Sequence, residues 1–139
     1  MHDGIQPMSS SATGASARLR GVNLGGWLVL EKWMTPSLFD GLEATDETTW
    51  CAELGTQAPA RLQAHWNAFI TRDDFAWLAG VGINAVRMPL GHWIFGPPYP
   101  YHAKYGPNHH PFVMGGIDVL DRALGWASEF GLRVVLDLH

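Results

Sequence analysis

The chain has 139 residues, of which 47% are hydrophobic and 16% are charged, a composition that is ordinary for a single globular domain. Its formal net charge is -4, and its Lys and Arg residues are scattered along the sequence. Nucleic acid is therefore not expected as a partner, because nucleic-acid binding needs a basic surface. No stretch approaches the ~20 consecutive apolar residues that cross a bilayer, so we expect no membrane span.

The N-terminal stretch over residues 1–17 is rich in Ser, Ala and Gly. It lacks the basic start and apolar run of a secretory signal, so the sequence reads as cytoplasmic, and the localisation itself stays unknown. We expect a disordered leader over residues 1–17 and a folded region over residues 18–139. The one cysteine, Cys51, cannot form an intramolecular disulfide and leaves the redox compartment open.

Short runs of β-forming residues, bounded by Gly or Pro, predict strands at Arg20–Leu24, Ile83–Met88 and Leu132–Leu138. Helical patterns lie between these strands. They predict helices at Ala58–Ile70, from Thr71 to Gly80, and at Ile117–Phe130. In the second helix, the Thr71 hydroxyl could cap the backbone, with Asp74 three residues on. In the third, apolar residues recur at helical spacing and Gly131 follows the expected end: Ile117, Leu120, Leu124 and Ala127.

Alternating strands and helices predict an α/β fold with a parallel sheet, because parallel strands need crossover helices. A doubly wound nucleotide-binding fold would need a G-x-G-x-x-G turn after the first strand, and Gly21, Gly25 and Gly26 do not have that spacing. A (β/α)₈ barrel fits better, since both strand-to-helix connections are long, roughly Gly25–Pro59 and Pro89–Gly116. We therefore predict about three strands of a (β/α)₈ TIM barrel.

Aromatic residues fill the two long connections. Flat rings of this kind suit a sugar, which has apolar C–H faces and hydroxyl edges, although any single ring could instead pack the loop against the barrel rim. As a group, they favour a saccharide cleft. They are Trp27, Trp33, Phe39, Trp50, Trp93, Phe95, Tyr99, Tyr101 and Tyr105.

Five segments resemble, in the same order, the exo-β-1,3-glucanases of glycoside hydrolase family 5. They are RGVNLGGWLVLEKWMTPSLFDG from Arg20, DETTW from Asp46, HWNAFITRDDF from His65, GINAVRMPLGHWIF from Gly82 and VVLDLH from Val134. The resemblance implies a retaining glycosidase that acts on β-1,3-glucan or a glucose-containing oligosaccharide. It implies no cofactor, and a monomer is expected for the full-length protein.

The resemblance also implies roles for several residues. Arg87 corresponds to an arginine beside the nucleophilic glutamate, and its fixed fork of N–H donors could hold that carboxylate in position, although a structural ion pair is the alternative. His139 corresponds to a histidine that lines the subsite next to the scissile bond. Its strand alternation puts Asp137 on the same side and beneath it, where Asp137 could accept a hydrogen bond inside the barrel, although a frayed chain end is the alternative for His139. Glu31 corresponds to a glutamate that binds the non-reducing-end glucose.

Aromatic sugar contacts are expected from Trp33, which stands where relatives often have tyrosine, and from Trp93 and Phe95. Asn23 is expected as a buried hydrogen-bonding residue of the first strand. His109 and His110 are adjacent, and adjacent residues in an extended loop point apart, so we expect solvated histidines and no metal site.

The two catalytic carboxylates are expected beyond His139, because in the family they follow later strands, the first within an Asn-Glu-Pro type motif. The acids that are present are assigned elsewhere. Asp73 and Asp74 fit a helix start, and Asp137 fits a strand end. Four others are expected in a loop without an obvious partner: Glu43, Asp46, Glu47 and Glu53. We therefore expect the chain to be inactive on β-1,3-glucan and poorly folded when it is alone.

Two other functions stay open at this stage. A non-catalytic saccharide-binding module would keep Glu31 and the aromatic loops without the chemistry. A different family 5 specificity, such as cellulase or mannanase, would keep the chemistry and change the substrate.

Overall fold

The computed structural model describes residues 18–96 and 112–139. The predicted leader lies outside the described residues, as do Tyr99, Tyr101, Tyr105, His109 and His110. The strands are β1 (Gly21–Asn23), β2 (Ala85–Leu90) and β3 (Arg133–Leu138). The α-helices are α1 (Glu47–Leu54), α2 (Ala58–Ala68), α3 (Arg72–Gly80) and α5 (Gly116–Glu129). Short 3₁₀ helices lie at Pro36–Phe39, Gly55–Gln57 and His92–Phe95.

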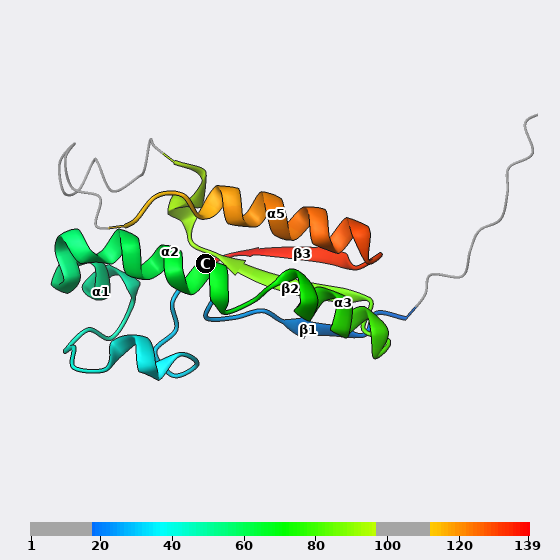
Figure 1. The fold of residues 1–139 in the computed structure, drawn as a ribbon, viewed down its shortest axis with the longest axis horizontal. Helices are drawn as coiled ribbons and strands as arrows, with labels where there is room; N and C mark the ends of the chain where they lie inside the picture. The colour runs from blue at the N-terminus through cyan, green and yellow to red at the C-terminus, as the bar shows by residue number, and fades with distance from the viewer. Residues whose placement is uncertain (1–17, 97–111) are drawn as a thin grey trace, which may run out of the picture.

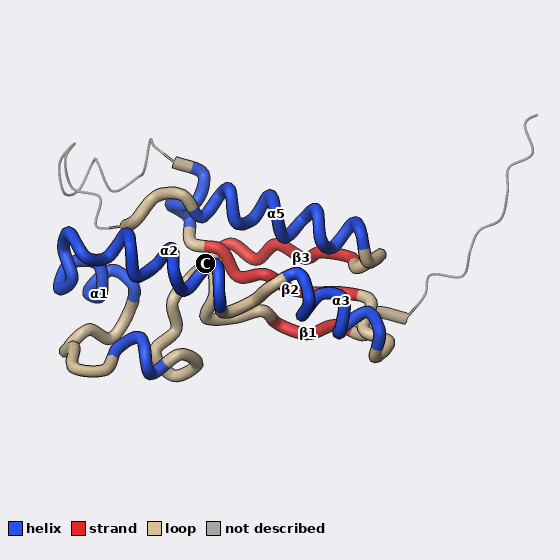
Figure 2. Tube along the Cα trace, in the orientation of Figure 1, coloured by secondary structure: helices blue, strands red, loops and turns tan. Residues whose placement is uncertain are grey.

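The three strands form one parallel sheet in the order β1-β2-β3, as Figures 1 and 2 show. Asn23 pairs with Arg87 across β1 and β2, and Arg87 pairs with Val135 across β2 and β3. The parallel sheet with intervening helices was predicted from the sequence, and each strand lies within two residues of the predicted bounds at either end.

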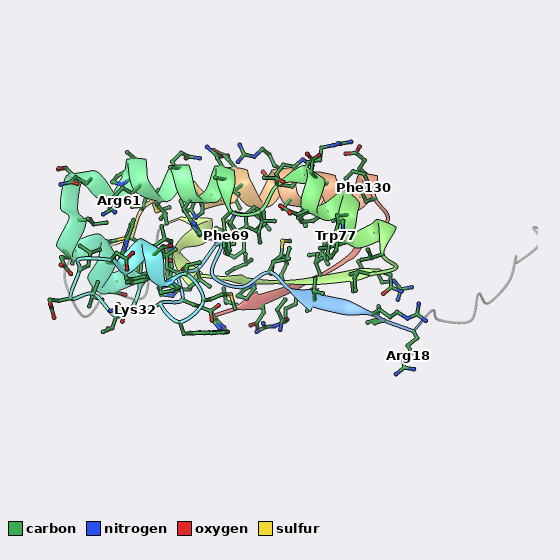
Figure 3. All side chains as sticks on the ribbon, turned by 60° about the horizontal axis from the view of Figure 1, so that its bottom comes forward. Arg18, Lys32, Arg61, Phe69, Trp77 and Phe130 are labelled. Carbon is green, nitrogen blue, oxygen red and sulfur yellow. The ribbon has the colours of Figure 1, made fainter. Side chains whose placement is uncertain are left out.

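The helices α2, α3 and α5 gather on one side of the sheet, and the other side carries no helix in the described ranges (Figure 3). Alternate residues of the central strand, Val86, Met88 and Leu90, are at most 1% exposed and belong to the main hydrophobic core. The in-register residues of β3 on the same face, Leu136 and Leu138, are 47% and 64% exposed. The side of β3 away from β2 is thus left uncovered by the described residues.

Helix α5 begins and ends close to its predicted bounds, and its end has a defined cause. Gly131 has φ +68°, a left-handed conformation that costs an L-residue energy and glycine nothing. Its N–H donates to Ser128 O at 3.3 Å, and the N–H of Leu132 donates to Ala127 O at 2.8 Å. These two bonds form a Schellman motif, which satisfies carbonyls that the helix end would leave free.

The start of α3 was also predicted, with a different hydrogen-bond arrangement. Asp74 Oδ2 accepts the Thr71 N–H at 2.7 Å and the Thr71 hydroxyl at 2.9 Å. The aspartate therefore reaches back to the residue before the helix, as in a capping box. The predicted apolar face is buried at Phe75 and Leu78, which both join the main core.

The long connection after β1 is more ordered than the sequence indicated, and the prediction of unpartnered acids there was wrong for Asp46, Glu47 and Glu53. Asp46 caps α1, because its Oδ1 accepts the N–H of Thr49 at 2.8 Å. Glu53 accepts the backbone N–H groups of Glu43 and Ala44 at 3.1 and 2.9 Å. Glu47 is buried and also has a backbone partner, described below.

Gly131, which follows α5, and Gly125, which lies inside it, provide a matched test of this helix end. We expect Gly131→Ala to lower the free energy of unfolding by about 1–2 kcal/mol, because alanine is strained at positive φ. Gly125 lies within the same helix with open space around it, so Gly125→Ala should raise that free energy by roughly 0.5–1 kcal/mol. Urea unfolding of both variants measures the difference; a stabilising Gly131→Ala would contradict the assigned helix end.

Candidate functional site

Polar side chains meet where the three parallel strands end. Asn23 ends β1, Arg87 lies in β2, and Asp137 lies near the end of β3. His139 follows β3 and is fixed to the sheet by its backbone N–H, which donates to Leu90 O at 2.8 Å. Because the carboxyl ends of parallel strands lie at one edge, residues 64 and 50 positions apart from Arg87 come within hydrogen-bond range of it.

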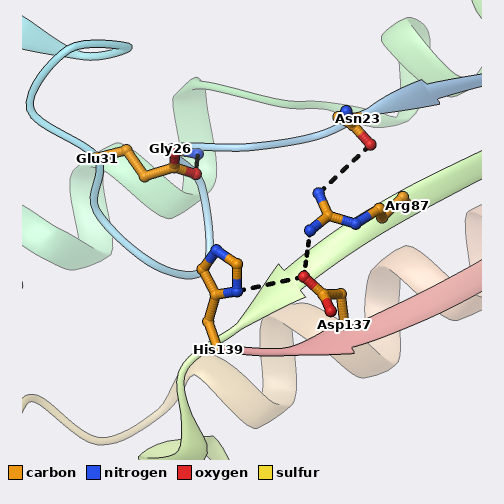
Figure 4. A network of polar contacts seen from close by, with 6 residues as sticks. All are labelled: Asn23, Gly26, Glu31, Arg87, Asp137 and His139. Atoms are coloured by element: carbon orange, nitrogen blue, oxygen red, sulfur yellow. Dashed lines mark hydrogen bonds and ion pairs between the residues drawn. The ribbon is translucent and has the colours of Figure 1, made fainter.

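Arg87 is the centre of this group (Figure 4). Its Nη2 donates to Asp137 Oδ2 in an ion pair, and its Nη1 is 3.4 Å from Asn23 Oδ1. The ion pair that the sequence left as an alternative is therefore present. Asn23 was predicted to be buried, and this was wrong: it is exposed, because it lies on the sheet face that the helices do not cover.

His139 lies on the other side of the same carboxylate. Its Nδ1 is 3.2 Å from Asp137 Oδ2, the oxygen that also accepts from Arg87. Asp137 and His139 thus lie on one side of β3, as strand alternation predicted, with these two atoms close enough to interact. The side chains of both residues are partly exposed, at 49% and 33%, so the group is open to an incoming molecule.

Glu31 comes from the connection after β1 and folds back over the glycines at its start. Its Oε1 accepts the Gly26 N–H at 3.2 Å, and its Oε2 accepts the indole N–H of Trp33 at 3.0 Å. A Cβ at Gly25 would lie 3.0 Å from Oε1 and 2.9 Å from the end of the Met34 side chain, so a larger residue there would displace both side chains. Leu24 N donates to Arg87 O at 2.8 Å, which ties this connection to the strand that carries Arg87. Figure 4 shows Glu31 and the strand-end group together.

Three hydrogen bonds from α1 and α2 hold the turn that precedes Glu31. They join His65 Nε2 to Gly26 O at 2.7 Å, Trp27 Nε1 to Trp66 O at 3.0 Å, and Leu30 N to Glu47 Oε2 at 2.8 Å. All three are buried, where a hydrogen bond that loses its partner is costly. The position of Glu31 therefore depends on residues far away in the sequence.

Glu47 is unusual among the residues that hold the turn before Glu31. Its side chain is buried, and burial raises its pKa from 4.5 to about 7, although the N–H of Leu30 opposes the rise. Within the described residues, its Oε1 has no hydrogen-bond partner. Burial, and secondly the charge of Glu47, raise the pKa of the Cys51 thiol to about 11. Sequence reasoning missed Glu47, and its place directly after a helix-capping aspartate was the one available signal.

The other titratable member is His65, whose pKa burial lowers while its hydrogen bond to Gly26 opposes the change. Its ring packs on Phe69 with centroids 4.7 Å apart. A neutral imidazole is thus favoured by the apolar surroundings and fits a structural role for His65.

The loop aromatics divide into two groups. Trp27, Phe39 and Trp50 are at most 2% exposed and pack the core, which is the alternative that the sequence left open. Trp33 and Phe95 are 75% and 61% exposed and can meet a ligand.

Trp93 had been predicted as a sugar contact, and its surroundings argue against that. It is 8% exposed, and its ring stacks on Phe112 with centroids 3.7 Å apart. A Cβ at Gly91 would lie 2.2 Å from the indole, which packs on that backbone. The indole therefore fills space within the structure, and little of its surface is left for a ligand.

Within residues 18–96 and 112–139, no three His, Cys, Asp or Glu side chains are arranged to hold a metal ion. None of the helices in these ranges is long and apolar enough to cross a bilayer.

Known proteins resemble the chain in sequence over nearly all of its length. The probable glucan 1,3-beta-glucosidase A of Emericella nidulans is 48% identical over 133 residues, which are 94% of this chain and 31% of that protein. The protein of the same name from Aspergillus niger is 47% identical, over 96% of this chain and 31% of its own length. These homologues are named as probable glucan 1,3-beta-glucosidases, which confirms the resemblance to enzymes of that kind. No protein-family model matches the chain.

Solved structures agree in fold. The rutinosidase from Aspergillus niger has a TM-score of 0.66 and 27% identity over 85% of this chain and 32% of its own. The structure of AoRut has a TM-score of 0.65 and 29% identity over 87% and 32%. The chain therefore spans about a third of the length of the proteins that it matches.

The pKa of Glu47 gives a pH-dependent stability whose sign can be stated. In the folded state the carboxyl stays protonated up to about pH 7, whereas an unfolded glutamate loses its proton near 4.5. Folding then loses stability as pH rises from about 4.5 through 7, by about 3 kcal/mol at 1.36 kcal/mol per pKa unit.

We expect Glu47→Gln to remove this part of the pH dependence, because the amide carbonyl keeps the bond to Leu30 N–H without a charge. Glu53→Gln, at an exposed acid of the same helix, is the control and should keep the wild-type slope. Urea unfolding at pH 5, 6, 7 and 8 measures both. Equal slopes in wild type and Glu47→Gln would contradict the buried carboxyl.

Proposed function

Because the chain is homologous over 94% of its length to a probable glucan 1,3-beta-glucosidase A, we propose that it contributes the first part of a (β/α)₈ barrel that hydrolyses β-glucan. Within the described residues, the sheet is parallel, its strands follow chain order, and its helices lie on one face. In a barrel this helical face is the outside, and the strand ends carry the active site.

The observation that carries this proposal is the polar group at the strand ends. Arg87, Asp137 and His139 lie at the edge where (β/α)₈ enzymes place their chemistry, on the face that would line the barrel. The uncovered side of β3, with Leu136 and Leu138 exposed, fits a position beside further βα units of such a barrel.

The chemistry proposed for Arg87 follows from its donors. A guanidinium has five N–H donors and is always charged, and Asn23 and Asp137 take one donor each. The remaining N–H donors of Arg87 can bind a catalytic carboxylate, keep it ionised and orient it toward the anomeric carbon of the sugar. A retaining glycosidase needs such a nucleophile and a second carboxyl that acts first as acid and then as base. Both are proposed to come from outside the chain described here.

The proposed sugar contacts come from two sides. His139 offers a ring nitrogen near the reacting sugar, and Glu31 offers carboxylate oxygens that already accept one hydrogen bond each. Trp33 is bound to Glu31 and presents an exposed ring on which a sugar can stack. Trp33 therefore joins the carboxylate and the apolar surface in one subsite.

A second candidate is a glycosidase with another sugar specificity. The likeness in fold to a rutinosidase, at a TM-score of 0.66, favours it. The two candidates are separated by substrate: glucose release from a β-1,3-glucan supports the first, and release of a disaccharide such as rutinose from a glycosylated aromatic compound supports the second.

A grafted enzyme tests the proposal. Residues 18–139 replace the aligned segment of the Emericella nidulans protein, and glucose release from laminarin, a β-1,3-glucan, is measured. We expect activity, and we expect Arg87→Lys to lower kcat about 100-fold, because lysine lacks the fixed fork that orients a carboxylate. Arg122→Lys is the control, since Arg122 binds Asn67 on the helical side.

Two outcomes would contradict the proposal. One is a grafted enzyme that folds with the thermal midpoint of the parent and releases no glucose. The other is an Arg87→Lys variant with unchanged kcat.

The Trp33 subsite has its own prediction. We expect Trp33→Ala in the grafted enzyme to raise KM for laminarin oligosaccharides about tenfold, because a stacked aromatic contributes roughly 0.5–1.5 kcal/mol beyond its buried area. Trp77 is 66% exposed on α3 and serves as the matched control, so Trp77→Ala should leave KM unchanged. Equal effects of the two substitutions would count against a sugar contact at Trp33.

A further inference from the structure

One carboxylate oxygen lies close to two nitrogen-bearing side chains at the strand ends. Asp137 Oδ2 accepts from Arg87 Nη2 and lies 3.2 Å from His139 Nδ1. A guanidinium can only donate, so this oxygen acts as an acceptor in the pair with Arg87. The same oxygen can bond to His139 only if the proton of the imidazole is on Nδ1.

The position of the His139 ring is restricted at both ends. Its backbone N–H donates to Leu90 O at 2.8 Å, and its ring Nδ1 lies 3.2 Å from Asp137 Oδ2. The hydrogen bond made by one ring nitrogen decides which protons the other nitrogen carries. With Nδ1 as donor to Asp137, a neutral His139 has a lone pair on Nε2.

We propose that Asp137 is a positioning residue, which fixes His139 in the Nδ1–H tautomer so that Nε2 meets the substrate as a hydrogen-bond acceptor. The consequence for a sugar rests on the proposed function: Nε2 then accepts a proton from a sugar hydroxyl, and a ligand that only accepts hydrogen bonds at this point is disfavoured. Arg87 and His139 are also coupled, because both depend on one carboxylate.

A purely structural ion pair between Arg87 and Asp137 makes a different prediction. Both side chains are partly exposed, at 38% and 33%, and exposed pairs of this kind contribute little to stability. In that case the removal of Asp137 would leave the tautomer of His139 as it is. The tautomer is therefore the readout that separates the two roles.

The test uses the grafted enzyme, with its histidines labelled with ¹⁵N, at a pH where imidazole is neutral. The signals of His139 are identified by their loss in His139→Gln. We expect a protonated Nδ1 and an unprotonated Nε2 in the grafted enzyme without further substitution. A predominant Nε2–H form, or a mixture of both, would overturn the proposal.

Two substitutions at Asp137 sharpen the test. Asp137→Ala removes the acceptor, and we expect His139 to shift mainly to the Nε2–H form, which free imidazole side chains favour. Asp137→Asn keeps a carbonyl oxygen that can accept from both donors, so we expect it to retain the wild-type tautomer. Asp121→Ala, at an exposed acid of α5, is the control and should change nothing. An Asp137→Ala variant with the wild-type tautomer would overturn the proposal.

Two further measurements distinguish a change in the tautomer of His139 from a loss of folding or of activity. The signals of the buried His65 report whether a variant keeps its fold, and the grafted enzyme without further substitution decides the tautomer even if Asp137→Ala unfolds. In the grafted enzyme, Asp137→Ala should lower kcat/KM about 100-fold and Asp137→Asn less than tenfold. Because the tautomer is read without substrate, a failure of glucan hydrolysis would refute the proposed function and leave the assignment of His139 standing.

Discussion

The parallel pairing of β1, β2 and β3 is the constraint on which the rest of the structure depends. Pairing of Asn23 with Arg87 and of Arg87 with Val135 sets which side chains share a face. One face carries apolar residues that the helices bury, and the other carries the polar group at the strand ends. Burial on one face therefore fixes the register, and the register brings Arg87 and Asp137 together.

Much of this architecture could be predicted from the sequence, because strand and helix periods are local signals. The end of α5 is an example, since Gly131 follows the last apolar position and has the positive φ that stops a helix. The structure of the connection after β1 could not be predicted. The burial of Glu47 depends on Leu30, seventeen residues earlier, and no local pattern specifies that an acid will accept a backbone N–H at this distance.

In the candidate site, too, some features could be predicted from the sequence and others could not. Alternation along β3 put Asp137 and His139 on one side, and the structure joins them through one oxygen. The exposure of Asn23 and the burial of Trp93 were not predicted. Both depend on what packs nearby: Asn23 faces the side without helices, and Trp93 is covered by Phe112 from the far end of a long connection. The residue types in the sequence were enough to identify the candidate site residues. Which of these side chains remain accessible to a ligand depends on packing, which the sequence pattern does not specify.

We propose that the strand-end group and Glu31 bind one sugar from two sides. A crystal structure of the grafted enzyme with a bound glucose-containing oligosaccharide tests it most directly. We expect sugar hydroxyls within hydrogen-bond distance of Glu31 and His139, with a sugar ring over Trp33. A sugar bound elsewhere, or one bound at the strand ends with Glu31 turned away from it, would refute this binding mode.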